Sequence, residues 1–473
     1  MTGNNKRHVI VGDGVTALEF AEATRLDKGD QLTIIGPEVK QLGRGVAYAQ
    51  EPESAPWRYA YLLNSPSFGV SSEFADWMHD HWEHLKTIMS GRRPDWVKDG
   101  TPYIARGDIS GLNAPRSLFG DFLHRRAERL LASLRDRGID VVEIEDAVVD
   151  IHEVENKLTV ITRNGRQLYV DSVDVATGGP VGQRYEGDDT AGSFQSLFGN
   201  EAQIVERLNP GSRVCCIGSN ATMLDVLRLC QSVLDEEQFE LIALSPAARL
   251  PEALYPPWPR TLTEPDLGGP CTTAAEFIDV ISREMRLARH KGERMAEMRG
   301  GFRKVFVDRG LSAFVPDMAE ARKVPGFIRK TFLGGTRDSI EDFQRLQVLG
   351  TTRLQAMTVS EIRAGSNELQ IHGIDTEGRA NVHRADIVLN CAGPGRIPTF
   401  DGLTQSMIVK GWLSVCGVSG GLQVGADCQT AVQGVRHLSP ATTVIGNEVM
   451  AYPLYDAEQL RVVVRKANGL TPD

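Results

Sequence analysis

The stretch that decides the fold is His8-Val-Ile-Val-Gly12-Asp-Gly14-Val-Thr-Ala17-Leu-Glu-Phe-Ala21, close to the N-terminus. A short β-branched run is followed by the pattern Gly12-x-Gly14-x-x-Ala17 and then by helical periodicity to about Leu26. This order of strand, glycine turn and helix is typical of a dinucleotide-binding fold. Gly12 permits the sharp turn, Gly14 lets the backbone approach a pyrophosphate, and small Ala17 lets the helix pack on its strand. The first helical amides, at Val15 and Thr16, are expected to face the phosphates.

A second strand, Gln31-Leu-Thr-Ile-Ile35, follows at the interval that this fold requires. An acidic residue normally ends the strand and binds a ribose hydroxyl. Here Gly36-Pro37 stands at that end, and Glu38 is the nearest carboxylate after the strand. The sequence therefore leaves open whether Glu38 reaches the ribose from the loop.

Composition excludes several classes of protein. The 473 residues carry 52 Lys+Arg against 62 Asp+Glu, a net charge of -10, which opposes nucleic-acid binding. Because no apolar run is long enough to span a membrane and no signal-peptide pattern is visible, we expect a cytoplasmic protein without membrane contact. The seven cysteines contain no C-x-x-C, and the histidines at 79, 81 and 84 fit a solvated helix end better than a metal site.

Two loops and a helix then carry a family resemblance. They are Gly43-Arg-Gly-Val-Ala47-Tyr48, the segment Tyr61-Leu-Leu63-Asn64-Ser-Pro66, and a helical Phe74-x-x-Trp77 stretch. Together with the glycine turn, this combination resembles bacterial FAD/NAD(P)-binding flavoproteins with two nested dinucleotide folds. These are relatives of the class B flavin monooxygenases and include nitrosuccinate-forming aspartate N-hydroxylases.

The resemblance implies where FAD is held. Ala47, Tyr48, Leu63 and Asn64 would line the isoalloxazine ring. An apolar strand that ends in Ala176-Thr177-Gly178-Gly179-Pro180 implies a second FAD contact at Thr177 and Gly178, before the chain crosses into the next domain. Near the C-terminus, the turn Gly446-Asn447 implies a backbone contact to the flavin.

A second strand, turn and helix at 211–225 stands where the family has its NAD(P)H fold, with Gly218, Ser219, Asn220, Ala221 and Thr222 in the turn. Asn220 replaces the middle glycine and Met223 the small third residue. Asparagine tolerates positive φ, so the turn is expected to form while its side chain crowds a pyrophosphate. Arg249, just past the next strand, is placed either to pair with a 2′-phosphate, favouring NADPH, or to lie on the surface.

The expected architecture is α/β, with two Rossmann-like dinucleotide-binding domains arranged as in glutathione reductase. We expect the first part of the FAD domain at 1–205, the NAD(P)H-binding domain at 206–350 and the second part of the FAD domain at 351–473. The middle domain carries a helical, cation-rich insertion at about 272–346. The segment Asp386-Ile-Val-Leu-Asn390-Cys-Ala-Gly-Pro394-Gly395 echoes 174–180, and in the family such echoes mark the two crossings between domains.

The resemblance implies an NADPH-using flavin monooxygenase that consumes O2 and hydroxylates a small amine or amino-acid-like substrate. The cations of the insertion allow an anionic substrate, and no catalytic side chain is assigned. Two alternatives stay open: an FAD oxidase or dehydrogenase reduced directly by its substrate, and a flavin-binding redox partner or sensor without turnover. The sequence also leaves a homo-oligomer open.

Overall fold

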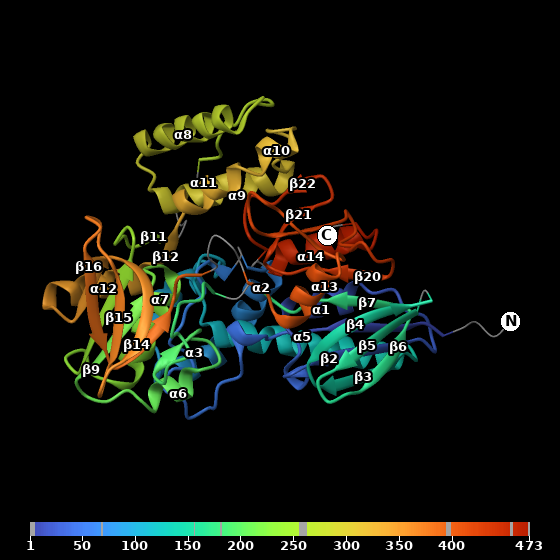
Figure 1. Cartoon of the computed structure of the whole chain (residues 1–473), viewed down its shortest axis with the longest axis horizontal. Coiled ribbons are helices and arrows are strands. Elements are labelled where there is room, and N and C mark those ends of the chain that lie inside the picture. The colour runs from blue at the N-terminus through green and yellow to red at the C-terminus, as the bar shows by residue number, and fades with distance from the viewer. Residues whose placement is uncertain are drawn as a thin grey trace.

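Two parallel β-sheets, lying at opposite ends of the molecule, organise the chain (Figure 1). The computed structural model describes residues 5–67, 70–155, 157–179, 182–254, 263–393, 399–454 and 457–471. The first sheet contains, in spatial order, β20 (Val435–His437), β7 (Ser172–Val175), β1 (Arg7–Val11), β2 (Gln31–Gly36) and β3 (Asp140–Glu145). The predicted strand, glycine turn and helix at the N-terminus are confirmed by β1 and α1 (Val15–Ala23).

The second sheet repeats the order of the first. Its parallel strands are β8 (Ser193–Phe194), β17 (Ile387–Asn390), β9 (Ser212–Ile217), β10 (Phe239–Ser245) and β13 (Thr352–Ala356). In both sheets the strand before the glycine turn lies between the strand that follows it in sequence and the strand that returns late. The chain therefore contains two copies of one dinucleotide fold.

A three-stranded antiparallel unit precedes the returning strand in each copy. These units are β4 (Val148–Val154), β5 (Lys157–Thr162) and β6 (Gln167–Val170) in the first copy, and β14 (Thr358–Ala364), β15 (Leu369–Ile374) and β16 (Ala380–Ala385) in the second. The predicted echo between 174–180 and 386–395 thus reflects equivalent strands, β7 and β17. Pro180, Pro394 and Gly395 of these segments lie outside the described residues.

Sheet membership differs from the domain boundaries expected at 205/206 and 350/351. Strand β8 pairs with β17, and β13 pairs with β10, so both lie in the second sheet. Because β13, β17 and the unit between them complete the second fold, the chain returns to the first fold only after β17. The sequence pattern specifies strands but not which neighbour each one pairs with. The expected return to the first fold at 350/351 therefore comes before the return that the structure shows, which follows β17.

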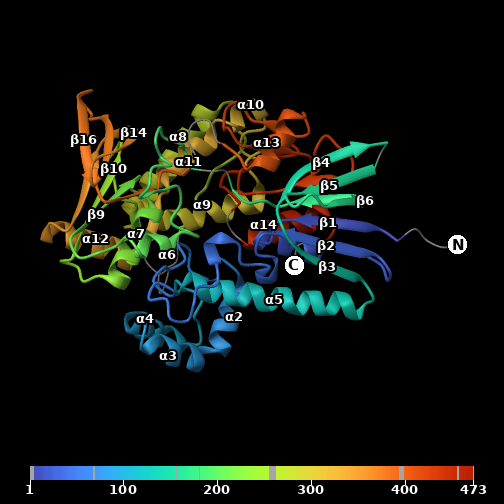
Figure 2. The same cartoon turned by 60° about the horizontal axis from the view of Figure 1, so that its bottom comes forward.

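Helices cover the sheets and fill the region between them (Figure 2). Those of the first fold are α1, α2 (Ser72–Asp80), α3 (Trp82–Ser90), α4 (Pro94–Ile104), α5 (Arg116–Asp136), α13 (Gly402–Val409) and α14 (Ala457–Ala467). Those of the second fold are α6 (Glu201–Val205), α7 (Ala221–Val233) and α12 (Arg337–Leu349).

The predicted helical insertion forms a separate layer above the space between the sheets (Figure 1). It consists of α8 (Ala274–His290), α9 (Met295–Arg309), α10 (Met318–Ala321) and α11 (Val324–Thr331), and it has its own apolar core. A short ladder of β11 (Glu252–Leu254) and β12 (Gly334–Thr336) lies where the insertion leaves and rejoins the second fold. We call α8 to α11 the cap.

The cap is anchored on the C-terminal segment. Strands β18 (Ser414–Val415), β19 (Leu422–Val424), β21 (Thr442–Ile445) and β22 (Glu448–Val449) form a small sheet there. The carboxylate of Glu448 accepts hydrogen bonds from the amides of Leu311 and Ser312 in the cap, and Val444 and Val449 belong to the cap's core. The cap is therefore held against the first fold as well as covalently joined to the second.

Candidate active site

A cavity of about 1190 Å³ opens at the carboxyl ends of the first sheet. The ends of β1, β2 and β7 contribute Val11, Ile35 and Ala176 to its wall. In open parallel sheets, ligands bind at this edge, outside the carboxyl ends of the strands. The volume exceeds the roughly 300–1,000 Å³ of pockets for drug-sized ligands, so it suits a dinucleotide together with a small second molecule.

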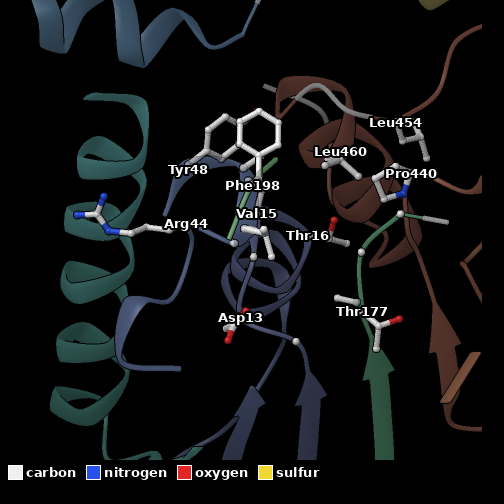
Figure 3. Close-up of a pocket in the computed structure, with 18 of the residues that line it drawn as sticks. Asp13, Val15, Thr16, Arg44, Tyr48, Thr177, Phe198, Pro440, Leu454 and Leu460 are labelled. Carbon is white, nitrogen blue, oxygen red and sulfur yellow. The ribbon is translucent and has the colours of Figure 1, made fainter. Parts of the chain in front are cut away.

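Many residues predicted as cofactor contacts line this cavity, although they come from distant parts of the sequence (Figure 3). They are Gly12, Gly14, Val15, Thr16, Ala47, Tyr48, Leu63, Asn64, Thr177, Gly178 and Thr222. Only Thr222 comes from the turn of the second fold. The fold thus brings the predicted FAD segments together in one space, with one residue of the second fold at its edge.

Other predicted residues do not line the cavity within the described chain. They are Ala17, Glu38, Gly218, Ser219, Asn220, Ala221, Arg249, Gly446 and Asn447. Ala17 is fully buried, in agreement with its packing role, while Glu38 is exposed. Gly446 and Asn447 form the turn between β21 and β22, so the C-terminal wall comes instead from Pro440, 452–454 and the first turn of α14.

The two glycines of the first turn have different roles. Gly12 has φ 118°, and a Cβ there would lie 2.3 Å from the carbonyl oxygen of Ala176, so the fold itself requires glycine. Gly14 has φ -85°, and a Cβ there would lie 3.6 Å from the Cα of Gly45, an ordinary contact. Since the fold tolerates a side chain at Gly14, the open space beside it is available to a ligand at the start of α1.

Aromatic and apolar groups form one end of the cavity. Tyr48 and Phe198 both line the cavity, and Figure 3 draws their side chains. The Tyr48 ring meets Phe119 of α5 edge to face at 5.0 Å between centroids. Leu63 is held by a hydrogen bond from its amide to the Ala114 carbonyl (2.8 Å), which fixes the loop that also carries Asn64. These walls suit a flat heteroaromatic ring.

A buried polar chain supports Thr177. The Thr177 hydroxyl donates to the carboxylate of Asp401 (2.8 Å), which also accepts from the Thr404 hydroxyl (2.6 Å), and Thr404 lies 3.2 Å from Nε2 of His437. Burial lowers the pKa of His437 to about 4, so its imidazole is neutral at pH 7. The chain fixes the direction of the Thr177 hydroxyl at the end of β7.

The turn of the second fold repeats the geometry of the first. Gly218 has φ 114°, and a Cβ there would lie 2.5 Å from the Cys391 carbonyl oxygen. This matches Gly12, where a Cβ would clash with the carbonyl oxygen of Ala176. Asn220 has φ -98° and ψ -162°, so our expectation that its tolerance of positive φ maintains the turn is wrong. The positive φ belongs to Gly218, and Asn220 corresponds to Gly14. Its exposed side chain therefore stands where a pyrophosphate would approach.

Arg249 lies at the edge of the second fold. Its side chain is 59% exposed and pairs with Glu252 at 3.6 Å. The carbonyl of Arg249 accepts a hydrogen bond from the Ser219 hydroxyl at 2.7 Å, which ties this loop to the turn. The arginine is thus adjacent to the second turn, and its role toward a 2′-phosphate stays a prediction.

The cap supplies cavity residues that the sequence did not single out. Arg299 and Arg303, one turn apart on α9, line the cavity together with Tyr452. The Tyr452 hydroxyl is buried without a hydrogen-bond partner among the described residues, and burial raises the pKa of Tyr452 although both arginines oppose the shift. The sequence showed that this region is rich in cations, but not which of them reach the cavity, because that depends on how the cap packs.

Cationic side chains outnumber anionic ones in the wall. Among the described residues the wall contains arginines 44, 116, 163, 299 and 303 against aspartates 13, 146 and 401. Arg44 turns toward α5, where it donates to Asp121 at 2.7 Å. The balance favours an anionic ligand, since a focused positive field raises the local concentration of anions.

The glycine turn and part of the cavity wall lie within a segment that matches a known family. A family model described as FAD-NAD(P)-binding covers residues 9–180. This segment is similar to FAD/NAD(P)-binding domains. It contains β1, the Gly12 turn and β7, and so includes the part of the cavity wall that ends at Gly178 and Gly179. No curated protein matches the sequence.

Solved structures extend the likeness to nearly the whole chain. The FAD-bound cadaverine monooxygenase of desferrioxamine biosynthesis from Erwinia amylovora is 11% identical, with a TM-score of 0.60 over 98% of this chain and 95% of that one. The reduced ornithine hydroxylase from Pseudomonas aeruginosa is 14% identical, with a TM-score of 0.55 over 98% of each chain. The ornithine N-hydroxylase from Kutzneria sp. 744, with reduced FAD, NADP+ and L-ornithine, is 12% identical, with a TM-score of 0.52 over 98% and 97%. These similarities confirm the predicted fold class.

Two further findings bear on the early expectations. Within the described residues, no group of three or more His, Cys, Asp and Glu side chains is placed to hold a metal ion. His81, from the histidine-rich stretch, contacts Trp77 instead. Its Nδ1 lies 2.8 Å from the Trp77 carbonyl oxygen, and the two rings are stacked. No described helix has the length and apolar character needed to cross a membrane.

Proposed function

We propose that the protein is an FAD-dependent monooxygenase that uses NADPH and O2 to hydroxylate the nitrogen of a small amine or amino acid. The observation that carries the proposal is the shared cavity, in which the Gly14 turn, Thr222 of the second fold and arginines of the cap meet. The fold shared with the three N-hydroxylating enzymes supports it. For an amine, the balanced reaction is R-NH2 + O2 + NADPH + H+ giving R-NHOH + H2O + NADP+.

Each wall of the cavity has a distinct task in this proposal. FAD, when bound, supplies the oxygen-activating redox chemistry. The turn at Gly14 and the amides of α1 hold its pyrophosphate, while Tyr48, Leu63 and Asn64 enclose its ring. Phe198 and the cap arginines also line the cavity, where keeping water from the flavin would prevent the loss of reducing power to solvent.

Flavin reduction tests the proposal most directly. The purified protein should show the flavin absorbance band, and NADPH should bleach it under anaerobic conditions. Readmitting O2 with L-aspartate, L-ornithine or cadaverine should then yield a hydroxylated nitrogen from at least one of them. A protein without a flavin band, or one that none of the nucleotides and amines bleaches, would contradict the proposal.

A specific observation keeps an oxidase as the second candidate. Asn220 stands at the position that corresponds to Gly14, and its side chain narrows the approach to the second turn. If a substrate amine bleaches the flavin anaerobically and NADPH does not, the second fold acts as a structural support and the oxidase is the function.

Replacing Asn220 by glycine is expected to improve NADPH use. The Asn220→Gly protein should need less NADPH for half-maximal flavin reduction, because the amide group no longer occupies the pyrophosphate approach. Its stability should change by only a few tenths of a kcal/mol, since Asn220 makes no side-chain cap bond to α7 and glycine is a nearly equivalent N-cap. Anaerobic titration and thermal unfolding measure the two effects. Loss of reduction in this variant would mean that Asn220 contacts the nucleotide.

The cap arginines support a substrate that carries a carboxylate. Arg303→Met keeps most of the side-chain volume and removes the charge, so the KM of an anionic substrate should rise by about 10- to 100-fold, the range for a hydrogen bond to a charged group. Steady-state assays with L-aspartate and cadaverine should show the increase for aspartate alone. Arg286→Met is the matched control, since Arg286 is exposed on α8 and outside the cavity wall. A change confined to NADPH would assign Arg303 to the nucleotide instead.

A further inference from the structure

The end of β2 lacks the acidic side chain that dinucleotide folds use there. The strand ends at Gly36, which has no side chain, and Pro37 follows. Glu38 is exposed and does not line the cavity. In dinucleotide folds the adenosine ribose lies beside the end of the second strand, here β2. If FAD lies in this cavity, a residue other than one at the end of β2 must accept hydrogen bonds from the ribose hydroxyl groups.

The side chain of Asp13 fills the space left by Gly36. A Cβ built on Gly36 would lie 2.6 Å from Oδ2, 2.7 Å from Cβ and 2.8 Å from Cγ of Asp13. Carbon atoms do not approach this closely, so a side chain at position 36 and the Asp13 side chain exclude each other. The fold normally has a carboxylate at the end of the second strand. Here Gly36 stands at that position, and Asp13 of the glycine turn places its carboxylate beside it.

The Asp13 carboxyl group is fixed by a backbone hydrogen bond, and no cation is among the groups that shift its pKa. Its Oδ2 accepts a hydrogen bond from the backbone amide of Glu38 at 2.6 Å, which fixes the carboxyl group against the end of β2. Burial raises the pKa of Asp13 and backbone amides oppose the shift, with no cation among the causes. A fixed carboxylate that pairs with no cation among the described residues suits neutral hydroxyl donors and repels phosphate.

The surroundings of Asp13 match the adenosine half of a dinucleotide. In Figure 3, Asp13 lies at the base of the cavity, on the opposite side of the glycine turn from Tyr48 and Phe198. The wall near the ends of β2 and β3 also includes Pro37, Asp146 and Ala147. The aromatic end and Asp13 thus lie on the two sides of the pyrophosphate turn, as the two halves of FAD would.

We propose that Asp13 binds the ribose hydroxyl groups of the adenosine half of FAD, in place of the missing acidic residue at the end of β2. This inference rests on the proposed FAD function. It adds a specificity: because the carboxylate repels a 2′-phosphate, the first turn takes FAD and rejects NADPH, which leaves NADPH to the second fold.

A binding cycle between protein and ligand tests the assignment without turnover. Apoprotein is titrated with FAD and with an FAD analogue whose adenosine ribose lacks the 2′ and 3′ hydroxyls, and binding is followed by quenching of flavin fluorescence. The wild type should bind FAD about 10- to 100-fold more tightly than the analogue, the range for hydrogen bonds to a charged group. Asp13→Ala should bind both with nearly equal affinity, and Glu38→Gln, the matched control, should behave as the wild type.

A relocated carboxylate gives the second test. In Asp13→Gly/Gly36→Asp, glycine at position 13 removes the Asp13 Cβ, which would lie 2.7 Å from a Cβ at position 36. An aspartate therefore fits at the end of β2. This double variant should regain most of the discrimination that Asp13→Gly loses. Asp13→Asn, which retains an acceptor for the Glu38 amide, should keep the unfolding temperature of the apoprotein, separating ribose binding from support of the turn.

The outcomes separate this inference from the function on which it rests. A wild type that binds FAD while Asp13→Ala discriminates against the analogue as strongly would overturn the role of Asp13 alone. A wild type that binds neither ligand would overturn both the FAD function and this inference.

Discussion

The Gly14→Val protein is expected to fold normally and to purify without flavin. Gly14 has φ -85°, a conformation open to valine, and a Cβ there lies 3.6 Å from the nearest atom, the Cα of Gly45. The two methyl groups of valine would instead enter the cavity beside the first amides of α1. There they would displace the pyrophosphate from the backbone donors it needs, so the flavin affinity should fall far more than the stability.

Flavin content per protein and the thermal unfolding of the apoprotein measure these two effects. Gly269→Val is the matched control, because a Cβ at Gly269 meets open space and this residue lies outside the cavity wall. Gly12→Ala gives the contrast: its Cβ would meet the Ala176 carbonyl at 2.3 Å, so this variant should lose stability as well as flavin. A Gly14→Val protein that retains full flavin would show that the cofactor does not lie at this turn.

The sequence predicted the first fold and much of its cavity because the signals are local. The pattern around Gly12 and Gly14 specifies strand, turn and helix within a few residues. The segments around Tyr48, Asn64 and Thr177 could be assigned to one site only through the family resemblance, since they are distant in sequence. The structure brings them into one cavity, which is the arrangement that the resemblance implied.

What the sequence could not provide depends on pairing and packing over long distances. An amphipathic strand such as β13 has the same pattern in either sheet, so the return to the first fold was expected about 40 residues too early. The arginines of α9 reach the cavity only because Glu448 and the core around Val444 and Val449 dock the cap on the C-terminal segment. Asp13 was overlooked because a loop residue had to be compared in space with the empty position at Gly36.

Breaking the pair of Arg116 and Asp225 is expected to cause the largest loss of stability. Arg116 begins α5 in the first fold, and its guanidinium donates to Asp225 of α7 in the second at 3.1 Å, with both side chains largely buried. Arg116 also covers the ring of Phe198 in the cavity wall. Arg116→Met would leave the carboxylate buried without its partner, a change that costs about 3–5 kcal/mol.

The loss should depend on pH in a defined direction. Burial raises the pKa of Asp225 to about 6 although Arg116 lowers it, whereas the unfolded value is 3.8. The folded state holds the Asp225 proton more tightly than the unfolded state. The contribution of protonated Asp225 to the free energy of unfolding is therefore largest below pH 3.8 and is lost as the pH rises through about 6. Without Arg116 the folded pKa rises further, so the stability of the variant continues to fall at higher pH than that of the wild type.

Denaturant unfolding of wild type and Arg116→Met at pH 5 and pH 8 measures this difference. At pH 5 the Asp225 carboxyl is mostly protonated in both folded proteins, and the variant should lose only about 1.5–3 kcal/mol, the range for a hydrogen bond that involves one charged group. At pH 8 it should lose the full 3–5 kcal/mol estimated for a broken buried pair. Arg116→Met/Asp225→Asn should remove the part of the pH dependence that comes from Asp225, because position 225 then has no carboxylate to titrate. Arg135, like Arg116, lies on α5, and Arg135→Met breaks only a solvent-accessible pair with Glu143 of β3, so it should cost less than about 1 kcal/mol at either pH. An Arg116→Met loss that is equal at pH 5 and pH 8 would mean that packing on Phe198, and not the charge of Asp225, is what Arg116 contributes where the two folds meet.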